Sequence, residues 1–119
     1  AQLLTKIDDA LTNAHVLLLS DYQKGVLTPE TIQQIIAIAK AKGVVSVANA
    51  KPQSIPAYSG AGVVTLNRFE ATAASGRSKT IADSEAEEVA TLLRASIGVD
   101  SMVVTLGGSG MGCASDEGF

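Results

Sequence analysis

This sequence of 119 residues contains little cysteine and few aromatic residues, and it has no excess of positive charge. Its single cysteine, Cys113, forbids an internal disulfide and excludes zinc sites that are built from several cysteines. Aromatic residues make up 3% and tryptophan is absent, which argues against an aromatic-rich all-β sandwich. Twelve acidic residues against nine basic ones give a formal net charge of −3. A net acidic chain argues against a nucleic-acid partner, because phosphate neutralisation by Lys and Arg dominates that affinity.

Long apolar runs are missing as well. No stretch reaches the roughly 20 residues that span a membrane, and no charged start with an apolar run after it indicates a signal peptide. What the chain does contain is 46% hydrophobic and 18% charged residues, a globular balance that excludes intrinsic disorder. The mass of 12.1 kDa fits one domain, and no linker divides it. We expect a single soluble, cytoplasmic domain over residues 1–119.

Helical and strand patterns alternate along the chain. The first half of the chain predicts a helix near 2–13, a buried strand at 16–19, a helix from Thr28-Pro29 to Gly43 and a strand at 44–48. The second half predicts strands at 63–66 and 102–106 and a short return strand at 112–114. Between 66 and 102 we expect a helix that is opened by a Ser84-to-Glu87 capping box and stopped by Gly98. The most polar stretch, 75–84, is interpreted as an exposed loop. This order implies βαβ units, hence an α/β fold with a parallel sheet and helices on both faces.

Polar and glycine residues follow each predicted strand, where open α/β sheets bind ligands. Asp21 and Lys24 follow the first strand and Lys51 follows the second. The third strand leads into Asn67 and Glu70, and the fourth into a glycine-rich segment. Cys113, flanked by small residues, is interpreted as a buried, inert thiol.

The glycine-rich segment carries four glycines within six residues, 107–112. Glycines at this density let backbone N–H groups point into a common space and approach an anion. The segment is neither a P-loop nor a dinucleotide fingerprint, because no Lys-Ser/Thr and no helix start follow the glycines. A glycine-rich hairpin turn is the alternative interpretation, and the sequence leaves both open.

The pair Asn67 and Glu70 also has two interpretations. Asn67 can cap a short helix whose third residue, Glu70, completes a capping box. Alternatively, their oxygens organise a Mg²⁺-bound water shell beside phosphates, because hard cations prefer oxygen ligands. The two interpretations are compatible, since a cap also fixes the side chains.

Three segments in this order resemble the ribokinase-like (PfkB) carbohydrate kinases, with the closest likeness to the heptose-phosphate kinases of ADP-heptose synthesis. They are Ser20-Asp21-Tyr22-x-Lys24-Gly25-Val26-Leu27-Thr28, Asn67-Arg68-x-Glu70-Ala71 and Val104-Thr105-Leu106-Gly107-Gly108-x-Gly110. The resemblance spans nearly the whole chain, and the ordered set of three is far more specific than any one motif. It implies a Rossmann-type, three-layer fold of which this chain forms part.

The resemblance also implies an activity: ATP-dependent phosphoryl transfer to a hydroxyl of a sugar or sugar phosphate. By matching motif, Asn67 and Glu70 position Mg²⁺, Asn67 through water, together with the nucleotide phosphates. Thr105, Gly107 and Gly110 match the family's nucleotide-binding turn. Lys51 lies where heptose-phosphate kinases carry Asp-Pro-Lys and suits a phosphate. ATP and Mg²⁺ are the implied cofactors, ATP and a small sugar phosphate are the implied partners, and homo-oligomerisation stays open.

Two departures from the family pattern bear on these expectations. The chain has Asn49-Ala50 before Lys51 in place of Asp-Pro, which weakens the specific heptose assignment. The family's Gly-Ala-Gly-Asp segment, with the Asp base, is expected beyond Phe119, so no catalytic residue is assigned within this chain. Most of the sugar-binding part is expected before Ala1. We therefore expect a fragment of a larger kinase domain that catalyses poorly or not at all by itself.

Two other classes compete with the kinase. In a receiver-type domain, Asp21 would accept a phosphoryl group and Thr105 would be the switch hydroxyl, although glycines stand where that fold needs a lysine. A non-catalytic nucleotide-binding or purely structural module would keep the glycine turn and lack the chemistry.

Overall fold

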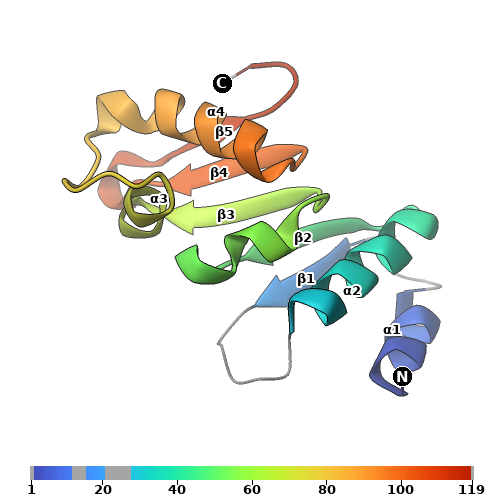
Figure 1. The fold of residues 1–119 in the computed structure, drawn as a ribbon. Coiled ribbons are helices and arrows are strands. Elements are labelled where there is room, and N and C mark those ends of the chain that lie inside the picture. Colours follow the sequence, from blue (N-terminus) through green and yellow to red (C-terminus); the bar gives the residue numbers. More distant parts are fainter. Residues whose placement is uncertain (1, 12–15, 21–27, 119) are drawn as a thin grey trace.

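A computed structural model describes residues 2–11, 16–20 and 28–118. The elements are α1 (Gln2–Leu11), β1 (Val16–Ser20), α2 (Pro29–Ala41), β2 (Val45–Asn49), the 3-10 helix η1 (Pro52–Tyr58), β3 (Val63–Asn67), α3 (Arg68–Ala74), the 3-10 turn η2 (Asp83–Glu85), α4 (Ala86–Ile97), β4 (Ser101–Thr105), the 3-10 turn η3 (Gly107–Ser109) and β5 (Met111–Ala114) (Figure 1). The predicted strands are confirmed to within a residue or so at each end. The order of elements confirms the α/β class.

Within the described residues, five strands form one sheet in the order β1-β2-β3-β4-β5. The first four are parallel, and β5 returns antiparallel to β4. A receiver-type domain has the doubly wound order 2-1-3-4-5, in which the chain reverses direction across the sheet. The sequential order found here excludes that alternative.

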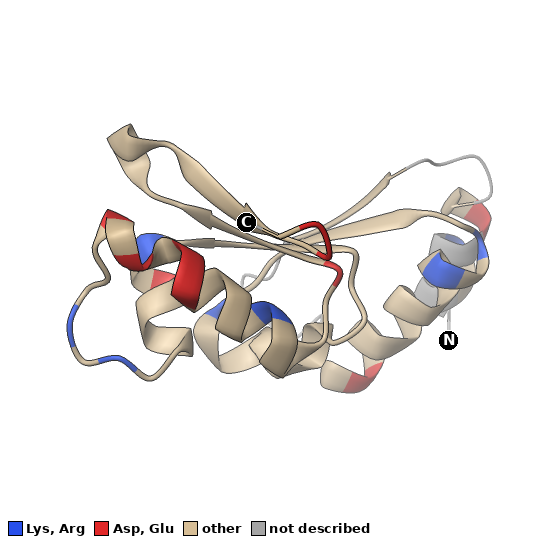
Figure 2. Cartoon of the chain, turned by 90° about the horizontal axis from the view of Figure 1, so that it is seen from above, with Lys and Arg blue, Asp and Glu red and all other residues tan. Residues whose placement is uncertain are grey.

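The helices α2, η1, α3 and α4 all cover the same face of the sheet (Figures 1 and 2), and α1 packs against α2. The expectation of helices on both faces is wrong for the described residues. The reason is topological, because right-handed crossovers that always step toward the next strand in one direction place every connecting helix on one side.

Strand side chains alternate between a buried face and an uncovered one. Val64, Leu66, Met102 and Val104 point toward the helices and are at most 1% exposed. On the opposite face Val16 and Leu18 are 58% and 67% exposed, so the prediction of a fully buried first strand is wrong. The same alternation exposes the thiol of Cys113, which corrects the interpretation of that residue as buried.

The helix termini follow local sequence signals in most places. Thr28 caps α2, its Oγ1 accepting from the Thr31 N–H at 3.1 Å, with Pro29 at the first helical position. Gly98 ends α4 in the left-handed conformation. The Ser84-to-Glu87 capping box is wrong. The first turn is instead organised by Glu85, whose Oε1 accepts from the Ala82 N–H at 2.9 Å.

Candidate functional site

The carboxyl ends of β2, β3 and β4 lie side by side, because these strands are parallel neighbours in the sheet. Lys51 follows β2, Asn67 ends β3, and Thr105 ends β4 directly opposite Asn67 in the strand register. The six predicted site residues are therefore carried by one edge of the sheet. Asp21 and Lys24 lie outside the described residues.

Asn67 and Glu70 form a complete capping box at the start of α3. The Asn67 Oδ1 accepts from the Glu70 N–H at 2.8 Å, and the Glu70 Oε1 accepts from the Asn67 N–H at 2.9 Å. The capping interpretation is thus confirmed. Both side chains are held in fixed positions by bonds that span three residues, so this part of the site is preorganised by the sequence itself.

Lys51 reaches the other oxygen of the same carboxylate. Its Nζ lies 3.3 Å from the Glu70 Oε2. The Glu70 side chain is 14% exposed and that of Lys51 is 45% exposed. An ion pair with one such exposed partner contributes at most about 1 kcal/mol. The contact joins the loop after β2 to the start of α3 and leaves the ammonium accessible.

The glycine segment is a tight turn between β4 and β5. The Leu106 N–H donates to the Gly110 carbonyl at 2.7 Å, and the Gly110 N–H donates back to the Gly107 carbonyl at 3.1 Å. Gly107 has a φ of 63° and Gly110 a φ of 95°. An added Cβ at either would meet nothing within 4 Å, so the outer side of the turn is open. The hairpin interpretation is confirmed, and the open backbone still permits a close approach by a ligand.

Oxygen donors suited to Mg²⁺ are limited here. Among the residues that the structure describes, no three His, Cys, Asp or Glu side chains gather into a metal-binding group. Both Glu70 oxygens already accept, one from the backbone and one from Lys51. This donor set fits a hydrated cation held through its water shell, and it does not fit a cation stripped of water.

Sequence reasoning missed two residues of this edge, Arg68 and Asp83. The Arg68 guanidinium ion-pairs with Asp83 and donates to the carbonyls of Ile81 and Leu106. The pKa of the Asp83 carboxyl is lowered, chiefly by the Ser109 hydroxyl and secondly by Arg68. One signal was available, because Arg68 places a cation at the first position of a helix, where the helix dipole disfavours it.

A separate hollow lies on the helical side of the molecule. It measures about 380 Å³ and lies between η1, α3 and α4, lined among others by Ile55, Leu93 and Ile97. None of the six candidate residues lines it, so we assign it no part in the site. No helix in the described part of the chain is long and apolar enough to cross a bilayer.

Comparison with known proteins places this edge in context. Residues 1–119 match the family described as pfkB family carbohydrate kinase. The bifunctional protein HldE of Caulobacter vibrioides is 36% identical over 111 residues, covering 93% of this chain and 23% of the relative. HldE of Paramagnetospirillum magneticum is 37% identical over 118 residues, covering 99% and 24%. The chain thus spans less than a quarter of the length of these relatives.

Solved structures share the fold. A mutant of phosphofructokinase-2 from Escherichia coli superposes with a TM-score of 0.78 at 20% identity, over 98% of this chain and 38% of that one. Ribokinase from Giardia lamblia gives a TM-score of 0.73 at 18% identity, over 99% and 38%. At these identities the likeness establishes the ribokinase-like fold and nothing finer.

Proposed function

Because this chain belongs to the pfkB family of carbohydrate kinases, we propose that it supplies the nucleotide and Mg²⁺ side of a site that phosphorylates a sugar or sugar phosphate. The acceptor class that we propose is a heptose phosphate, on the likeness to the HldE relatives. We also propose a cytoplasmic location, because the proposed reaction uses ATP. The observation that carries the proposal is the convergence of Lys51, Glu70 and the open glycine turn on one edge of the sheet.

Each residue has a role that its position supports. Lys51 is a point charge on an accessible stem, and it can exchange its contact with Glu70 for a nucleotide phosphate. Thr105 and the backbone of Gly107 and Gly110 line the approach to the turn, where a chain of phosphates can lie against the peptide groups. Asn67 and Glu70 present oxygens in fixed positions for the water shell of Mg²⁺.

Phosphoryl transfer depends mainly on positioning and charge stabilisation, which this set of groups provides on the nucleotide side. Bound Mg²⁺ would neutralise phosphate charge there. No residue of this chain is proposed as the base that takes the proton from the sugar hydroxyl. We therefore expect the 119-residue chain to bind Mg-ATP without sugar phosphorylation. Measurable Mg²⁺-dependent turnover by the pure chain would contradict that expectation.

Calorimetric titration with Mg-ATP is the direct test of the proposed binding. Glu70→Gln keeps an acceptor for the Asn67 N–H but removes the charge, so it separates the binding role from the capping role. Glu88→Gln is the matched control, because Glu88 loses an ion pair with Arg77 that lies away from the strand ends. Saturable binding that is weakened in Glu70→Gln and retained in Glu88→Gln supports the proposal. The absence of saturable binding contradicts it.

The acceptor requires a second experiment on the natural full-length protein that carries these residues. A panel of sugars and sugar phosphates is offered with Mg-ATP, and ADP release is measured. Preference for a heptose phosphate supports the proposed class. The Asn49-Ala50 dipeptide enters here, because restoring Asp-Pro at these positions tests whether the departure limits activity.

The competing hypothesis, a non-catalytic nucleotide-binding module, predicts the same binding of Mg-ATP at this site. It differs only in the second experiment, where the full-length protein would bind Mg-ATP and phosphorylate nothing on the panel.

A further inference from the structure

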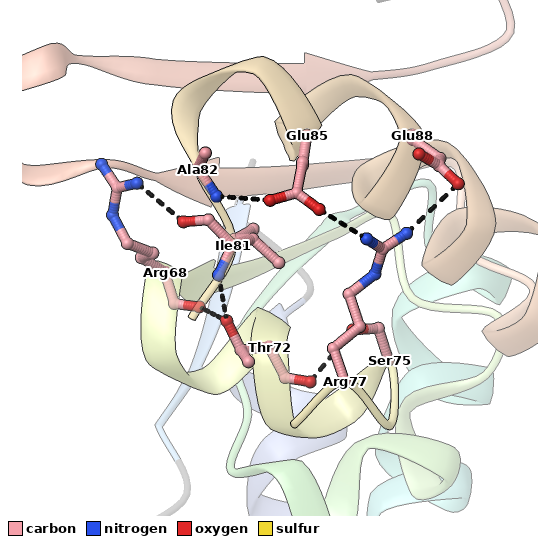
Figure 3. Close-up of polar contacts among 8 residues, drawn as sticks. All are labelled: Arg68, Thr72, Ser75, Arg77, Ile81, Ala82, Glu85 and Glu88. Carbon is pink, nitrogen blue, oxygen red and sulfur yellow. Dashed lines mark hydrogen bonds and ion pairs between the residues drawn. The ribbon is translucent and has the colours of Figure 1, made fainter. Parts of the chain in front are cut away.

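Arg68 joins three segments that are far apart in the sequence. Its Nη1 donates to the Ile81 carbonyl at 2.9 Å (Figure 3). Its Nη2 lies within hydrogen-bond distance of the Asp83 carboxylate. The same Nη2 donates to the Leu106 carbonyl at 3.2 Å. A guanidinium offers five N–H donors in a fixed planar fork, which suits it to hold such a set of acceptors together.

The Leu106 carbonyl is the base of the glycine turn. It also accepts from the Ser109 N–H at 3.3 Å, and the Leu106 N–H donates to the Gly110 carbonyl at 2.7 Å. The Ser109 hydroxyl, which belongs to the turn, is the first cause that lowers the pKa of the Asp83 carboxyl, and Arg68 is the second. Arg68 thus holds the base of the turn, and Asp83 holds the guanidinium of Arg68.

Arg68 is at the same time the first residue of α3, directly after Asn67. It lies in the chain between Asn67 and Glu70, whose two mutual hydrogen bonds form the capping box. The Arg68 side chain is 23% exposed. One residue therefore links the capping box to the glycine turn, 38 residues farther along the chain.

The segment that contains Ile81 and Asp83 is held in place by further contacts of its own. The Thr72 hydroxyl donates to the Arg68 carbonyl at 2.8 Å and accepts from the Ile81 N–H at 3.1 Å. Arg77 ion-pairs with Glu85 at 2.7 Å and with Glu88 at 3.2 Å (Figure 3). Arg77 is thus a second arginine in the same region, with comparable ion pairs and exposure, that does not contact the glycine turn.

We propose that Arg68 is a positioning residue for the nucleotide. Together with Asp83 it sets the glycine turn at a fixed distance from Asn67 and Glu70, so that both parts contact one and the same ligand. This inference rests on the proposed nucleotide-binding function and adds two residues to it. Arg68 itself is engaged with protein acceptors and is not proposed to contact the phosphates.

The test compares Arg68→Met with Arg77→Met in the natural full-length protein. Mg-ATP affinity is measured by titration, and the KM values for ATP and sugar phosphate are measured by turnover. Hydrogen exchange of the backbone amides of 106–112 is measured without ligand. Arg68→Lys, which keeps the charge but loses the fork, and Asp83→Asn complete the set.

We expect Arg68→Met to weaken Mg-ATP binding roughly 5- to 20-fold, about the size of one hydrogen bond lost outside the direct contacts. The KM for ATP rises while the KM for the sugar phosphate stays within about twofold, because the acceptor side is untouched. Amide exchange at 106–112 accelerates in Arg68→Met and not in Arg77→Met. Arg68→Lys and Asp83→Asn lie between the wild type and Arg68→Met.

Two negative results are distinguishable. If the wild type binds no Mg-ATP, the proposed function fails and this inference fails with it. If the wild type binds Mg-ATP, but Arg68→Met matches Arg77→Met in nucleotide affinity, the proposed function stands and the positioning role of Arg68 is overturned. An equal rise in both KM values also overturns it, because that pattern indicates a general loss of structure.

Discussion

Gly110 has a backbone conformation, φ 95° and ψ −140°, that residues with a side chain rarely adopt. Its carbonyl accepts from the Leu106 N–H at 2.7 Å, so this conformation closes the turn between β4 and β5. We predict that Gly110→Ala destabilises the protein through its backbone alone. Outside Gly110 and its two chain neighbours an added Cβ meets no atom within 4 Å, which removes crowding by other parts of the protein as a cause.

The magnitude follows from the dihedral angles. Forcing alanine into a region that is essentially restricted to glycine costs about 1–3 kcal/mol. Gly107, with φ 63°, lies in the left-handed helical region, where alanine costs roughly 1–2 kcal/mol. Gly108 has no positive φ and open space around it. Gly108→Ala is therefore the matched control and is expected to be neutral or stabilising by up to about 1 kcal/mol, through the unfolded chain.

Equilibrium unfolding in urea measures all three variants. The expected order of unfolding free energies is Gly108→Ala highest, Gly107→Ala intermediate and Gly110→Ala lowest, with an unchanged dependence on urea. For Gly110→Ala, each kcal/mol lost lowers the melting temperature by about 4 °C in a domain of this size. If Gly110→Ala and Gly108→Ala differ by less than about 0.5 kcal/mol, the argument from backbone conformation is refuted.

Three further predictions concern the groups around this turn. Glu70→Ala loses the acceptor of the capping box and should lower the free energy of unfolding by about 1 kcal/mol, whereas Glu70→Gln should stay within about 0.5 kcal/mol of the wild type in the same urea assay. Thr72→Val leaves the N–H of buried Ile81 without its acceptor and should cost about 1–3 kcal/mol; wild-type stability in this variant would contradict the bridge. The pKa of Asp83 is lowered, chiefly by the Ser109 hydroxyl and secondly by Arg68. The contribution of this carboxylate to folding stability is therefore complete above about pH 4 and is lost as the pH falls through the lower folded-state pKa. The stabilities of the wild type and Asp83→Asn should therefore converge in acid, and a difference that persists or grows below pH 4 would refute the assignment.

Features that depend on residues close in sequence were predictable. The Thr28 cap with Pro29, the stop at Gly98 and the pair Asn67 and Glu70 all form through bonds that span only a few residues. Short apolar runs marked the strands because each strand buries one face against the helices. The failed capping box at Ser84 shows the limit of such signals, since Glu85 offers the Ala82 N–H an equally local acceptor.

The candidate site was predictable as a list of positions and not as a geometry. Strand ends directed attention to Lys51, Asn67 and Thr105, and the parallel sheet does carry them on one edge. Arg68 was missed as a functional residue, because its partner Leu106 is 38 residues away and its contacts involve backbone carbonyls that have no sequence signature.

The sequence by itself determined the alternation of helices and strands, the helix caps and the residue types at the strand ends, because these depend on local bonding and on the burial of single faces. Only the tertiary structure decided which face the helices cover, since that depends on the direction of successive crossovers. It likewise decided the exposure of Cys113, the meeting of Lys51 with Glu70 and the hold of Arg68 on the glycine turn. Each of these requires segments distant in the chain to take one particular register, and that register is set by packing of the whole sheet.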